Sequence, residues 1–295
     1  MASIEVLQAG LFSTVQDRGR DGYSAVGLGR SGVADRSSAA LANRMLGNWA
    51  DAAMIETTFG GLEVQCRGAL QLVITGAACE VTVTRQTVVG QRKHGAAVLE
   101  LISLGDGDVI SLGRPTRGLR SYLAIRGGIE TPVILGSRSW DSLAQLGTPP
   151  LAPGMQLPIG RTAPSWPAVD AVAPPLIDDA PTVLEALLGP RTEWFTNMAI
   201  SMLESQVYTV SQDSNRIGMR LTAGTPLERR ITAELSSEGV ELGSLQVPPK
   251  GFPVVFLADH PVTGGYPVIA VLRQKSIDLA AQLAPGAQLR FRLVP

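Results

Sequence analysis

The sequence predicts a mainly β protein, and three observations support this prediction. The chain of 295 residues contains 32 glycines and 20 prolines with short apolar runs between them, a pattern typical of strands joined by turns. Several segments alternate apolar and polar residues, as at Leu62, Val64 and Cys66. Residues 151–159 closely match residues 283–291, and each copy is a Pro-Gly turn followed by a strand-like segment. We interpret this repeat as evidence for two related β-barrel halves.

Only a few short helices are expected. The longest is predicted over residues 35–46, because Asp35 can cap its start, apolar residues recur at helical spacing, and Gly47 with Asn48 can end it. Residues 194–203 are expected to form a second short helix, and residues 277–283 one or two helical turns.

A segment rich in alanine and proline divides the chain. Residues 161–181 carry repeated prolines and no apolar periodicity, which suits a semi-rigid linker without a core of its own. We therefore predict an N-terminal barrel domain over residues 1–165, a linker over residues 166–181, and a C-terminal barrel domain over residues 182–295.

Composition excludes several classes of protein. The 25 basic and 26 acidic residues nearly cancel, which argues against a nucleic-acid or membrane-surface partner. No apolar run reaches the roughly 20 residues that span a bilayer and no signal peptide is recognised, so a cytoplasmic protein is expected. Cys66 and Cys79 lie in strand-like segments and are predicted to be reduced, buried thiols. Because nearly all basic residues are arginines, any phosphate or carboxylate would be recognised mainly by arginine and backbone amides.

The most informative stretch is residues 246–270. An apolar run over residues 254–257 leads to Asp259, and a turn rich in Gly and Pro then presents Thr263, Gly264, Gly265 and Tyr266 before a second apolar run. Two glycines let a ligand approach the backbone and leave amide donors free. One interpretation is a binding site on a loop at the ends of two strands. The other is a plain β-hairpin with a Gly-Gly turn.

Two further segments allow two interpretations each. Gln16, Asp17 and Arg20 crowd a turn after the first strand-like segment: Asp17 could cap the turn and pair with Arg20, or Gln and Arg could grip a carboxylate or ureido group. Arg216 and Arg220 flank Gly218, where they are either solvated or in contact with an anion.

Other motifs point away from familiar sites. Residues 27–32 fit G-x-G-x-x-G, but no clear strand precedes them, so we predict no dinucleotide site and at most an anion held by flexible amides. The chain has no P-loop motif. Its two histidines, His94 and His260, suggest neither a zinc site nor a Ser-His-Asp triad.

The ordered motifs together resemble a known family. The chain is similar to the family called allophanate hydrolase subunit 2, or biotin-dependent carboxyltransferase-like, which includes one subunit of bacterial 5-oxoprolinase, the one designated C, and part of the carboxyltransferase region of urea amidolyase. The motifs that carry the resemblance span nearly the whole chain and lie at residues 14–23, 31–35, 41–48, 120–128, 135–139, 214–221, 237–240 and 259–267.

The resemblance implies a fold and a function. It implies two cyclophilin-like β-barrel domains and a subunit of an ATP-dependent amide or lactam hydrolase, like that subunit of 5-oxoprolinase. Such an enzyme cleaves non-peptide C–N bonds and is expected to be active only as a heteromer. The implied partners are a companion protein of the "subunit 1" family and a third protein of the lactam-utilisation family. ATP, with Mg, is the implied cofactor, and a small amide the implied substrate.

The resemblance also suggests candidate site residues. Asp259 would bind a metal–nucleotide complex or take a proton, Tyr266 would hold the substrate amide, and Arg220 would act in phosphoryl transfer. No protein ligand for a resident metal is predicted. The candidates for substrate or nucleotide binding are Gln16, Asp17, Arg20, Arg216, Ser237, Gln246, Thr263, Gly264 and Gly265.

Two alternatives stay open. One is a carboxyltransferase that moves CO₂ from carboxybiotin, carried on another chain, to urea or a related amide. The other is a non-catalytic regulatory subunit that antagonises an inhibitor of a kinase. Val268 stands where relatives often have a lysine, which puts the identity of the substrate in doubt. The proposed mechanism depends on the expectation that the Gln16–Arg20 turn and the diglycine turn meet around one pocket.

Overall fold

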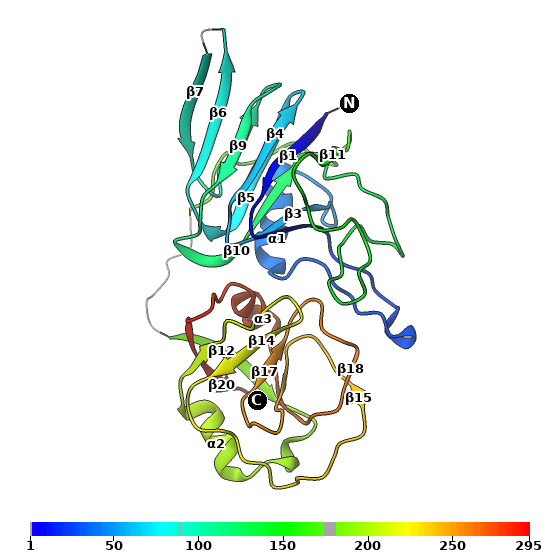
Figure 1. The fold of residues 1–295 in the computed structure, drawn as a ribbon, viewed down its shortest axis with the longest axis vertical. Coiled ribbons are helices and arrows are strands. Elements are labelled where there is room, and N and C mark those ends of the chain that lie inside the picture. Colours follow the sequence, from blue (N-terminus) through cyan, green and yellow to red (C-terminus); the bar gives the residue numbers. More distant parts are fainter. Residues whose placement is uncertain (1, 89, 174–180) are drawn as a thin grey trace. The chain divides into compact units, whose positions relative to one another are not determined.

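Figure 1 shows the computed structural model, which describes residues 2–88, 90–173 and 181–295. The chain forms two compact units. Unit 1 comprises Met1–Arg20, Asp35–Trp140 and Gln145–Leu176. Unit 2 comprises Asp21–Ala34, Asp141–Ala144 and Ile177–Pro295. Two short segments from the first half of the chain therefore belong to the C-terminal unit.

Unit 1 is built from two antiparallel sheets around one apolar core. The six-stranded sheet, in the order β11-β1-β4-β9-β6-β7, consists of β1 (Ser3–Ala9), β4 (Leu62–Arg67), β6 (Val81–Thr87), β7 (Gly90–Ala96), β9 (Val109–Leu112) and β11 (Gln156–Pro158). The five-stranded sheet, in the order β2-β3-β10-β5-β8, consists of β2 (Phe12–Gln16), β3 (Met54–Thr58), β5 (Leu70–Ala78), β8 (Ile102–Leu104) and β10 (Arg117–Ile125).

The alternation found in the sequence explains the faces of these strands. In β4 the side chains of Leu62, Val64 and Cys66 are buried while their neighbours are more exposed, as a two-residue period requires. Both cysteines are free thiols. Burial raises the pKa of the Cys66 thiol to about 11 and also raises that of Cys79, so neither resembles a reactive nucleophile.

The one long helix of unit 1, α1 (Arg36–Leu46), confirms its predicted limits. Asp35 caps its start, because the carboxylate accepts hydrogen bonds from the Ser38 amide at 2.9 Å and the Ser38 hydroxyl at 2.6 Å. Gly47 ends it in the left-handed conformation, with φ of 66°, and a Cβ there would lie 2.4 Å from the Ser165 carbonyl oxygen.

Unit 2 is a closed barrel with the strand order β12-β19-β16-β17-β14-β13-β20. Parallel pairing of β12 with β20 closes it. The strands are β12 (Thr182–Leu188), β13 (Tyr208–Val210), β14 (Gly218–Thr222), β16 (Ser244–Gln246), β17 (Val254–Phe256), β19 (Val268–Leu272) and β20 (Gln288–Leu293). A separate two-stranded ribbon pairs β15 (Glu238–Gly239) with β18 (Thr263–Gly264). The mainly β prediction is confirmed.

The sequence repeat has a matching structure in each unit. In unit 1 the Gly154 amide donates to the Val6 carbonyl at 2.8 Å, and the Val6 amide donates to the Met155 carbonyl at 2.9 Å. In unit 2 the Gly286 amide donates to the Val210 carbonyl at 2.9 Å, and the Val210 amide to the Ala287 carbonyl at 3.0 Å. Each Pro-Gly turn thus joins its following strand to the same kind of neighbour, which supports the interpretation of two related halves.

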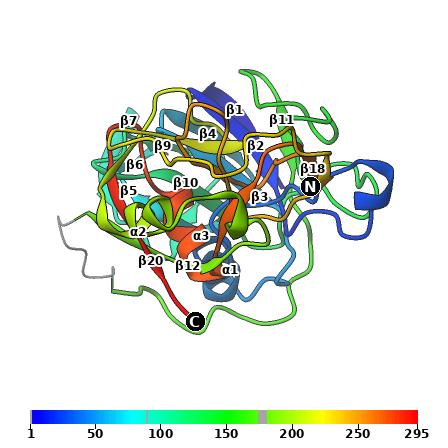
Figure 2. The ribbon, with the colours of Figure 1, turned by 90° about the horizontal axis from the view of Figure 1, so that it is seen from below.

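The short helices of unit 2 lie beside barrel strands. The helix α2 (Asn197–Ser205) lies against β20, and α3 (Gln274–Ala281) against β12 (Figure 2). The predicted second helix begins three residues later than expected, because Thr196 caps it through its hydroxyl and residues 192–194 form a separate 3-10 turn. The described part of the chain offers no helix with the length and apolar character that crossing a membrane requires.

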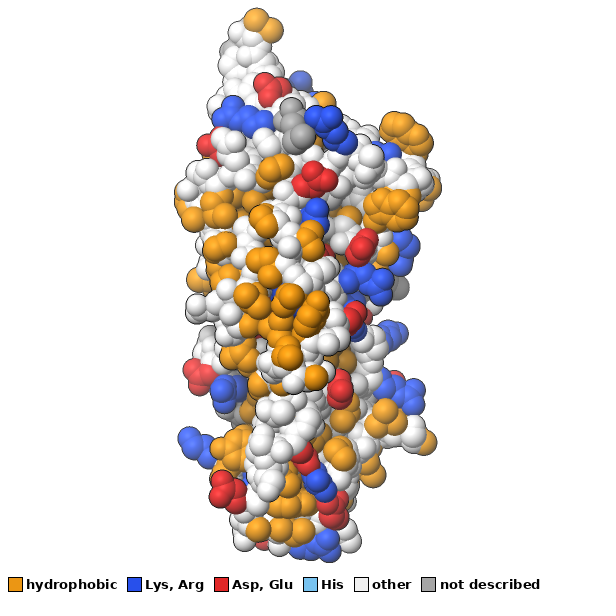
Figure 3. Space-filling view, turned by 90° about the vertical axis from the view of Figure 1, so that its right-hand side faces the viewer, with side chains coloured by type: hydrophobic (Ala, Val, Ile, Leu, Met, Phe, Trp, Pro, Cys, Tyr) orange, Lys and Arg blue, Asp and Glu red, His pale blue; other side chains and the backbone are white. Residues whose placement is uncertain are grey.

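Part of the predicted linker is attached to unit 1. The Leu101 amide donates to the Asp170 carbonyl, and the Val172 amide to the Leu99 carbonyl, at 2.7 and 2.9 Å. Residues 174–180 of the predicted linker lie outside the described residues. On the face drawn in Figure 3, basic and acidic side chains are interspersed, in keeping with the formal net charge of −1.

Candidate functional site

The diglycine turn of unit 2 lies beside a second predicted segment. Residues of β18 pair antiparallel with β15, so that Gly264 is opposite Glu238 and Thr263 is opposite Gly239. Continuing this register places Ser237 opposite Gly265. Two groups of predicted binding residues, separated by more than twenty positions in the sequence, are thereby brought together.

The pairing pattern turns the Gly265 amide away from the neighbouring strand. The Val240 amide donates to the Val262 carbonyl at 3.0 Å, so this pair is hydrogen-bonded. Bonded and non-bonded pairs alternate along an antiparallel ladder, which makes Gly264–Glu238 a bonded pair and Ser237–Gly265 a non-bonded one. Among the described residues, no group accepts a hydrogen bond from the amide of Gly265 or of Tyr266. The turn therefore presents two consecutive free donors.

Gln246 supports the turn from the barrel side. Its side chain is buried, and its Nε2 donates to the Tyr266 carbonyl at 3.0 Å. A Cβ added to Gly264 would lie 2.4 Å from the same Nε2. Glycine at 264 is therefore required by close packing, and Gln246 positions the turn rather than pointing away from it.

Two arginines lie around the turn, and only one has its charge balanced. Arg191 donates from Nε and Nη2 to the Glu238 carboxylate at 2.9 and 2.6 Å. Arg229 donates from Nη2 to the Val247 carbonyl, and its Cζ lies 5.8 Å from the centre of the Tyr266 ring. Across the described ranges, no carboxylate pairs with Arg229, and its buried Nε has no hydrogen-bond partner.

Burial lowers the pKa of the Arg229 guanidinium, because charge is disfavoured where water is excluded. Arginine nevertheless stays protonated at neutral pH. An unbalanced cation, two free amides and the phenol of Tyr266, whose side chain is 43% exposed, are thus gathered on one accessible turn. This combination is suited to a ligand that carries negative charge.

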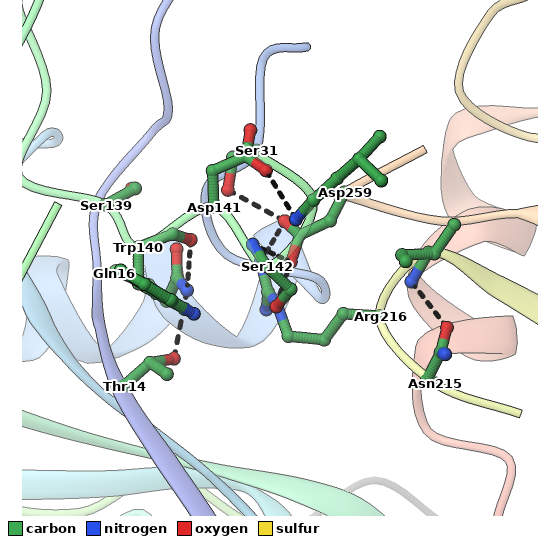
Figure 4. Close-up of polar contacts among 12 residues, drawn as sticks. Thr14, Gln16, Ser31, Ser139, Trp140, Asp141, Ser142, Asn215, Arg216 and Asp259 are labelled. Atoms are coloured by element: carbon green, nitrogen blue, oxygen red, sulfur yellow. Dashed lines mark hydrogen bonds and ion pairs between the residues drawn. The ribbon is translucent and has the colours of Figure 1, made fainter. Parts of the chain in front are cut away.

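Asp259 and Arg216 form a buried ion pair in unit 2 (Figure 4). Arg216 donates from Nε to Oδ2 at 2.8 Å and from Nη2 to Oδ1 at 2.9 Å. The Ser31 hydroxyl donates to Oδ1 at 2.7 Å, and the Ser142 amide to Oδ2 at 3.1 Å. Burial alone would raise the pKa of Asp259, but the charge of Arg216 and these hydrogen bonds outweigh it and hold the pKa below its usual value.

This network explains the glycine-rich motif at residues 27–32. The motif follows a short 3-10 helix, η1 (Ser24–Val26), and not a strand, in agreement with our prediction of no dinucleotide site. Its Ser31 has φ of 57° and binds Asp259, while the Gly32 carbonyl accepts from Arg216 Nη2 at 2.6 Å. The geometry therefore gives Arg216 and Asp259 a holding role for the segments Asp21–Ala34 and Asp141–Ala144 within unit 2. Their predicted contact with substrate stays a prediction.

Arg220 and His260 lie elsewhere in unit 2. Arg220 is exposed on β14 opposite Val254, and its hydrogen bonds to described residues involve only its backbone. His260 is buried, stacks on Phe256 with ring centres 5.7 Å apart, and donates from Nδ1 to the Pro261 carbonyl at 2.8 Å. Burial lowers the pKa of His260.

The predicted N-terminal turn lies in unit 1, where it binds the motif at residues 135–139. The Asp17 carboxylate accepts from the hydroxyls of Ser137 and Ser139 and from the Arg138 amide, each at 2.6 Å. Arg20 is buried and donates from Nη2 to the Ser139 carbonyl. These contacts match the structural interpretation of Asp17, whose carboxylate fixes the turn.

Gln16 ends β2 with its side chain buried (Figure 4). Its Nε2 donates to the Thr14 hydroxyl at 2.9 Å and to the Trp140 carbonyl at 3.0 Å. Its Oε1 has no hydrogen-bond partner within the described chain. Gln16, Asp17 and Arg20 thus lie in unit 1, and the other candidates lie in unit 2. That the two groups share one ligand stays a prediction.

Sequence reasoning missed Arg229, Arg191 and Ser142. Arg229 stands in an ordinary Glu-Arg-Arg run, and its contacts, Val247 and Tyr266, are 18 and 37 positions away. The described residues contain no group of three or more His, Cys, Asp and Glu side chains able to hold a metal ion.

Known proteins resemble this chain over almost its whole length. It is 33% identical over 292 residues to a 5-oxoprolinase subunit, designated C, of Escherichia coli (strain K12), a match that covers 98% of this chain and 90% of that protein. It is 28% identical over 294 residues to the 5-oxoprolinase subunit of the same designation from Haemophilus influenzae, covering 99% of this chain and 91% of that protein.

A solved structure and a family model agree with these relatives. The crystal structure of the K. lactis urea amidolyase superposes with a TM-score of 0.88 at 27% identity, covering 99% of this chain and 19% of that one. The chain thus spans about a fifth of that larger protein. The model described as "Carboxyltransferase domain, subdomain A and B" matches residues 26–293. The resemblance found in the motifs is confirmed, and the chain belongs to the carboxyltransferase-domain family of subdomains A and B.

Proposed function

We propose that this chain is a subunit of an ATP-dependent hydrolase that opens a small lactam carrying a carboxylate, with 5-oxoproline as its substrate. The observation that carries the proposal is the unbalanced charge of Arg229 beside the free amides of Gly265 and Tyr266. A carboxylate on the substrate would neutralise that guanidinium. The relatives named as 5-oxoprolinase subunits support the same substrate.

The chemical obstacle is the amide bond, whose carbonyl carbon is a poor electrophile because of resonance. Transfer of the γ-phosphoryl group of ATP to the lactam oxygen releases ADP and activates that carbon. Water then adds to it, the ring C–N bond breaks with a proton going to nitrogen, and a second water releases phosphate. One lactam, one ATP and two waters thus give the open amino acid, ADP and phosphate.

The residues of this chain would bind and orient the lactam. Arg229 would hold the carboxylate, and the amides of Gly265 and Tyr266 would donate to the lactam oxygen, where negative charge grows. The Tyr266 phenol would contact the ring amide, and Ser237 and Thr263 would contribute hydroxyls from the paired strands. The buried Arg216–Asp259 pair would act through position, because its hydrogen bonds are made within the protein.

Partners and the nucleotide belong to the same proposal. The names of the relatives describe subunits, and we infer that this chain also works in a heteromer with a companion protein of the "subunit 1" family and a third protein of the lactam-utilisation family. ATP, with Mg, is the second substrate of the assembly. Cytoplasmic location is part of the proposal too.

Carboxyl transfer to urea is the second candidate. The similarity to the K. lactis urea amidolyase favours it, with a TM-score of 0.88. Urea is neutral, however, and would leave the Arg229 charge without a partner. The two candidates therefore differ in whether the substrate must carry a carboxylate.

The test uses the chain co-expressed and purified with its companion proteins. Phosphate release from ATP is measured with 5-oxoproline, with urea and bicarbonate, and with no amide. We expect release that depends on 5-oxoproline and is matched by formation of glutamate. Binding of the companions without turnover of either amide would contradict the proposal and favour a regulatory role, whereas carboxylation of urea would favour the second candidate.

A further inference from the structure

Unit 1 contains a cleft that plays no part in the proposed function. Its volume is about 670 Å³, within the range of cavities that bind small metabolites. It lies between the beginning of β5, β8, the turn after β10 and residues 159–166, and all its lining residues belong to unit 1. The diglycine turn belongs to unit 2, so the cleft is a separate feature.

The charges that line the cleft are of one sign. Arg126 and Arg161 line it, and no aspartate or glutamate is among the lining residues that the structure describes. The remaining polar side chains, such as Gln71, Ser103 and Thr162, are neutral. A cleft with cations and no acid favours an anionic ligand.

Arg126 is held with one edge uncommitted. Its Nη1 donates to the Leu46 carbonyl at 2.6 Å and to the Ser165 carbonyl at 2.7 Å, which fixes the guanidinium plane. Its Nε and Nη2 have no hydrogen-bond partner among the described residues. These two atoms form the side-on edge that grips carboxylate and phosphate groups with two parallel hydrogen bonds.

Trp166 lies over the same arginine. Its side chain is 79% exposed, and the Arg126 Cζ lies 4.5 Å from its ring centre. Stacking on one side only leaves the indole available to a flat group. Close backbone approach makes another wall: a Cβ on Gly127 would lie 2.0 Å from the Gly160 carbonyl oxygen, so no side chain can replace either glycine there.

We propose that this cleft binds a small organic anion with a planar ring, whose oxyanion group is held by the Nε and Nη2 atoms of Arg126 and whose ring packs on Trp166. Nucleotides and cyclic carboxylates share this chemistry. The inference is independent of the proposed function, because it depends only on residues of unit 1.

The test is a titration of the full-length protein, followed by tryptophan fluorescence and calorimetry. The probes are ADP, 5-oxoproline and inorganic phosphate. ADP binding identifies a nucleotide site, 5-oxoproline binding identifies a carboxylate site, and phosphate alone should bind more weakly because it has no ring. No saturable binding of ADP or 5-oxoproline would overturn the proposal.

Variants make the test specific. Arg126→Lys keeps a charge but loses the two-pronged edge and should raise Kd at least about tenfold. Trp166→Ala removes an exposed side chain that is not needed for the core, so it should fold and still weaken binding. Trp49→Phe changes another exposed tryptophan outside the cleft and serves as the matched control. Unchanged Kd in both Trp166→Ala and Arg126→Lys would contradict the assignment.

Discussion

The guanidinium of Arg216 and the carboxylate of Asp259 meet side by side, Nε to Oδ2 at 2.8 Å and Nη2 to Oδ1 at 2.9 Å, with both residues buried. The Asp259 amide also donates to the Arg216 carbonyl at 3.0 Å, so backbone and side chains join the same two positions. A carboxylate with this many donors holds segments together, and this explains why an acid follows the β17 strand.

Breaking this pair should destabilise unit 2 strongly. Asp259→Asn leaves the Arg216 cation buried without a counter-charge, and we expect a loss of about 3–5 kcal/mol in the free energy of unfolding. Urea denaturation followed by circular dichroism measures it. The control is Asp21→Asn, which removes an exposed partner of Arg30 and should have a far smaller effect. Equal stability of Asp259→Asn and wild type would refute the holding role.

The same carboxylate should make stability depend on pH. The folded state holds the pKa of Asp259 below its ordinary value of 3.8, so its contribution is complete above that value and is lost as pH falls through the folded pKa. The difference in unfolding free energy between wild type and Asp259→Asn should therefore be large at pH 7 and shrink below about pH 4. A difference that stays constant between pH 7 and about pH 3 would argue against a depressed pKa.

Gly264 should tolerate no side chain. Gly264→Ala brings a Cβ to 2.4 Å from Gln246 Nε2 and should break its hydrogen bond to the Tyr266 carbonyl, which disturbs the turn. We expect at least about a tenfold loss of activity in the assembled enzyme, since small misplacements of binding groups are costly. Gly239→Ala is the matched control in the paired strand, because a Cβ there meets no atom within 4 Å. Similar activities for the two variants would show that the close approach does not matter.

The cysteines should be unreactive in the folded protein. The pKa of Cys66 is raised to about 11 by burial, with smaller effects from Asp108 and Asp106, and that of Cys79 is also raised. Little thiolate is present at about pH 8, so iodoacetamide should label neither residue until the protein is unfolded. Mass spectrometry after labelling, with and without urea, measures this. Rapid labelling of Cys66 in native protein would contradict its burial.

Local features of the fold could be predicted, because their causes lie within a few residues. The limits of α1 follow from Asp35 and Gly47, a cap and a left-handed end that are adjacent to the helix itself. The repeat at residues 151–159 and 283–291 predicted matching turns because each one is a single Pro-Gly unit. The parallel pairing of β12 with β20 could not be predicted, since it joins strands far apart in the sequence and no local pattern encodes it.

The candidate site was predicted in part for the same reason. The diglycine turn and Ser237 are visible as motifs, and the structure pairs their strands. Asp259 was visible as an acid after a strand, but its partner Arg216 is 43 positions away, so its buried pairing could not be inferred. Arg229 belongs to no motif, and its significance comes from the absence of a carboxylate near it within the described residues.

The central claim is that the charge of Arg229 selects a substrate with a carboxylate. The most direct measurement compares kcat/KM for 5-oxoproline with kcat/KM for 2-pyrrolidinone, the same lactam without the carboxylate, in assembled enzyme containing wild type, Arg229→Gln or Arg230→Gln. Arg230 is the matched control, because it donates to the Glu193 carbonyl and does not contact Tyr266. The account predicts a strong preference for 5-oxoproline that falls about a hundredfold in Arg229→Gln and persists in Arg230→Gln, since a lost charge pair costs about 2–5 kcal/mol. An unchanged preference in Arg229→Gln would contradict it.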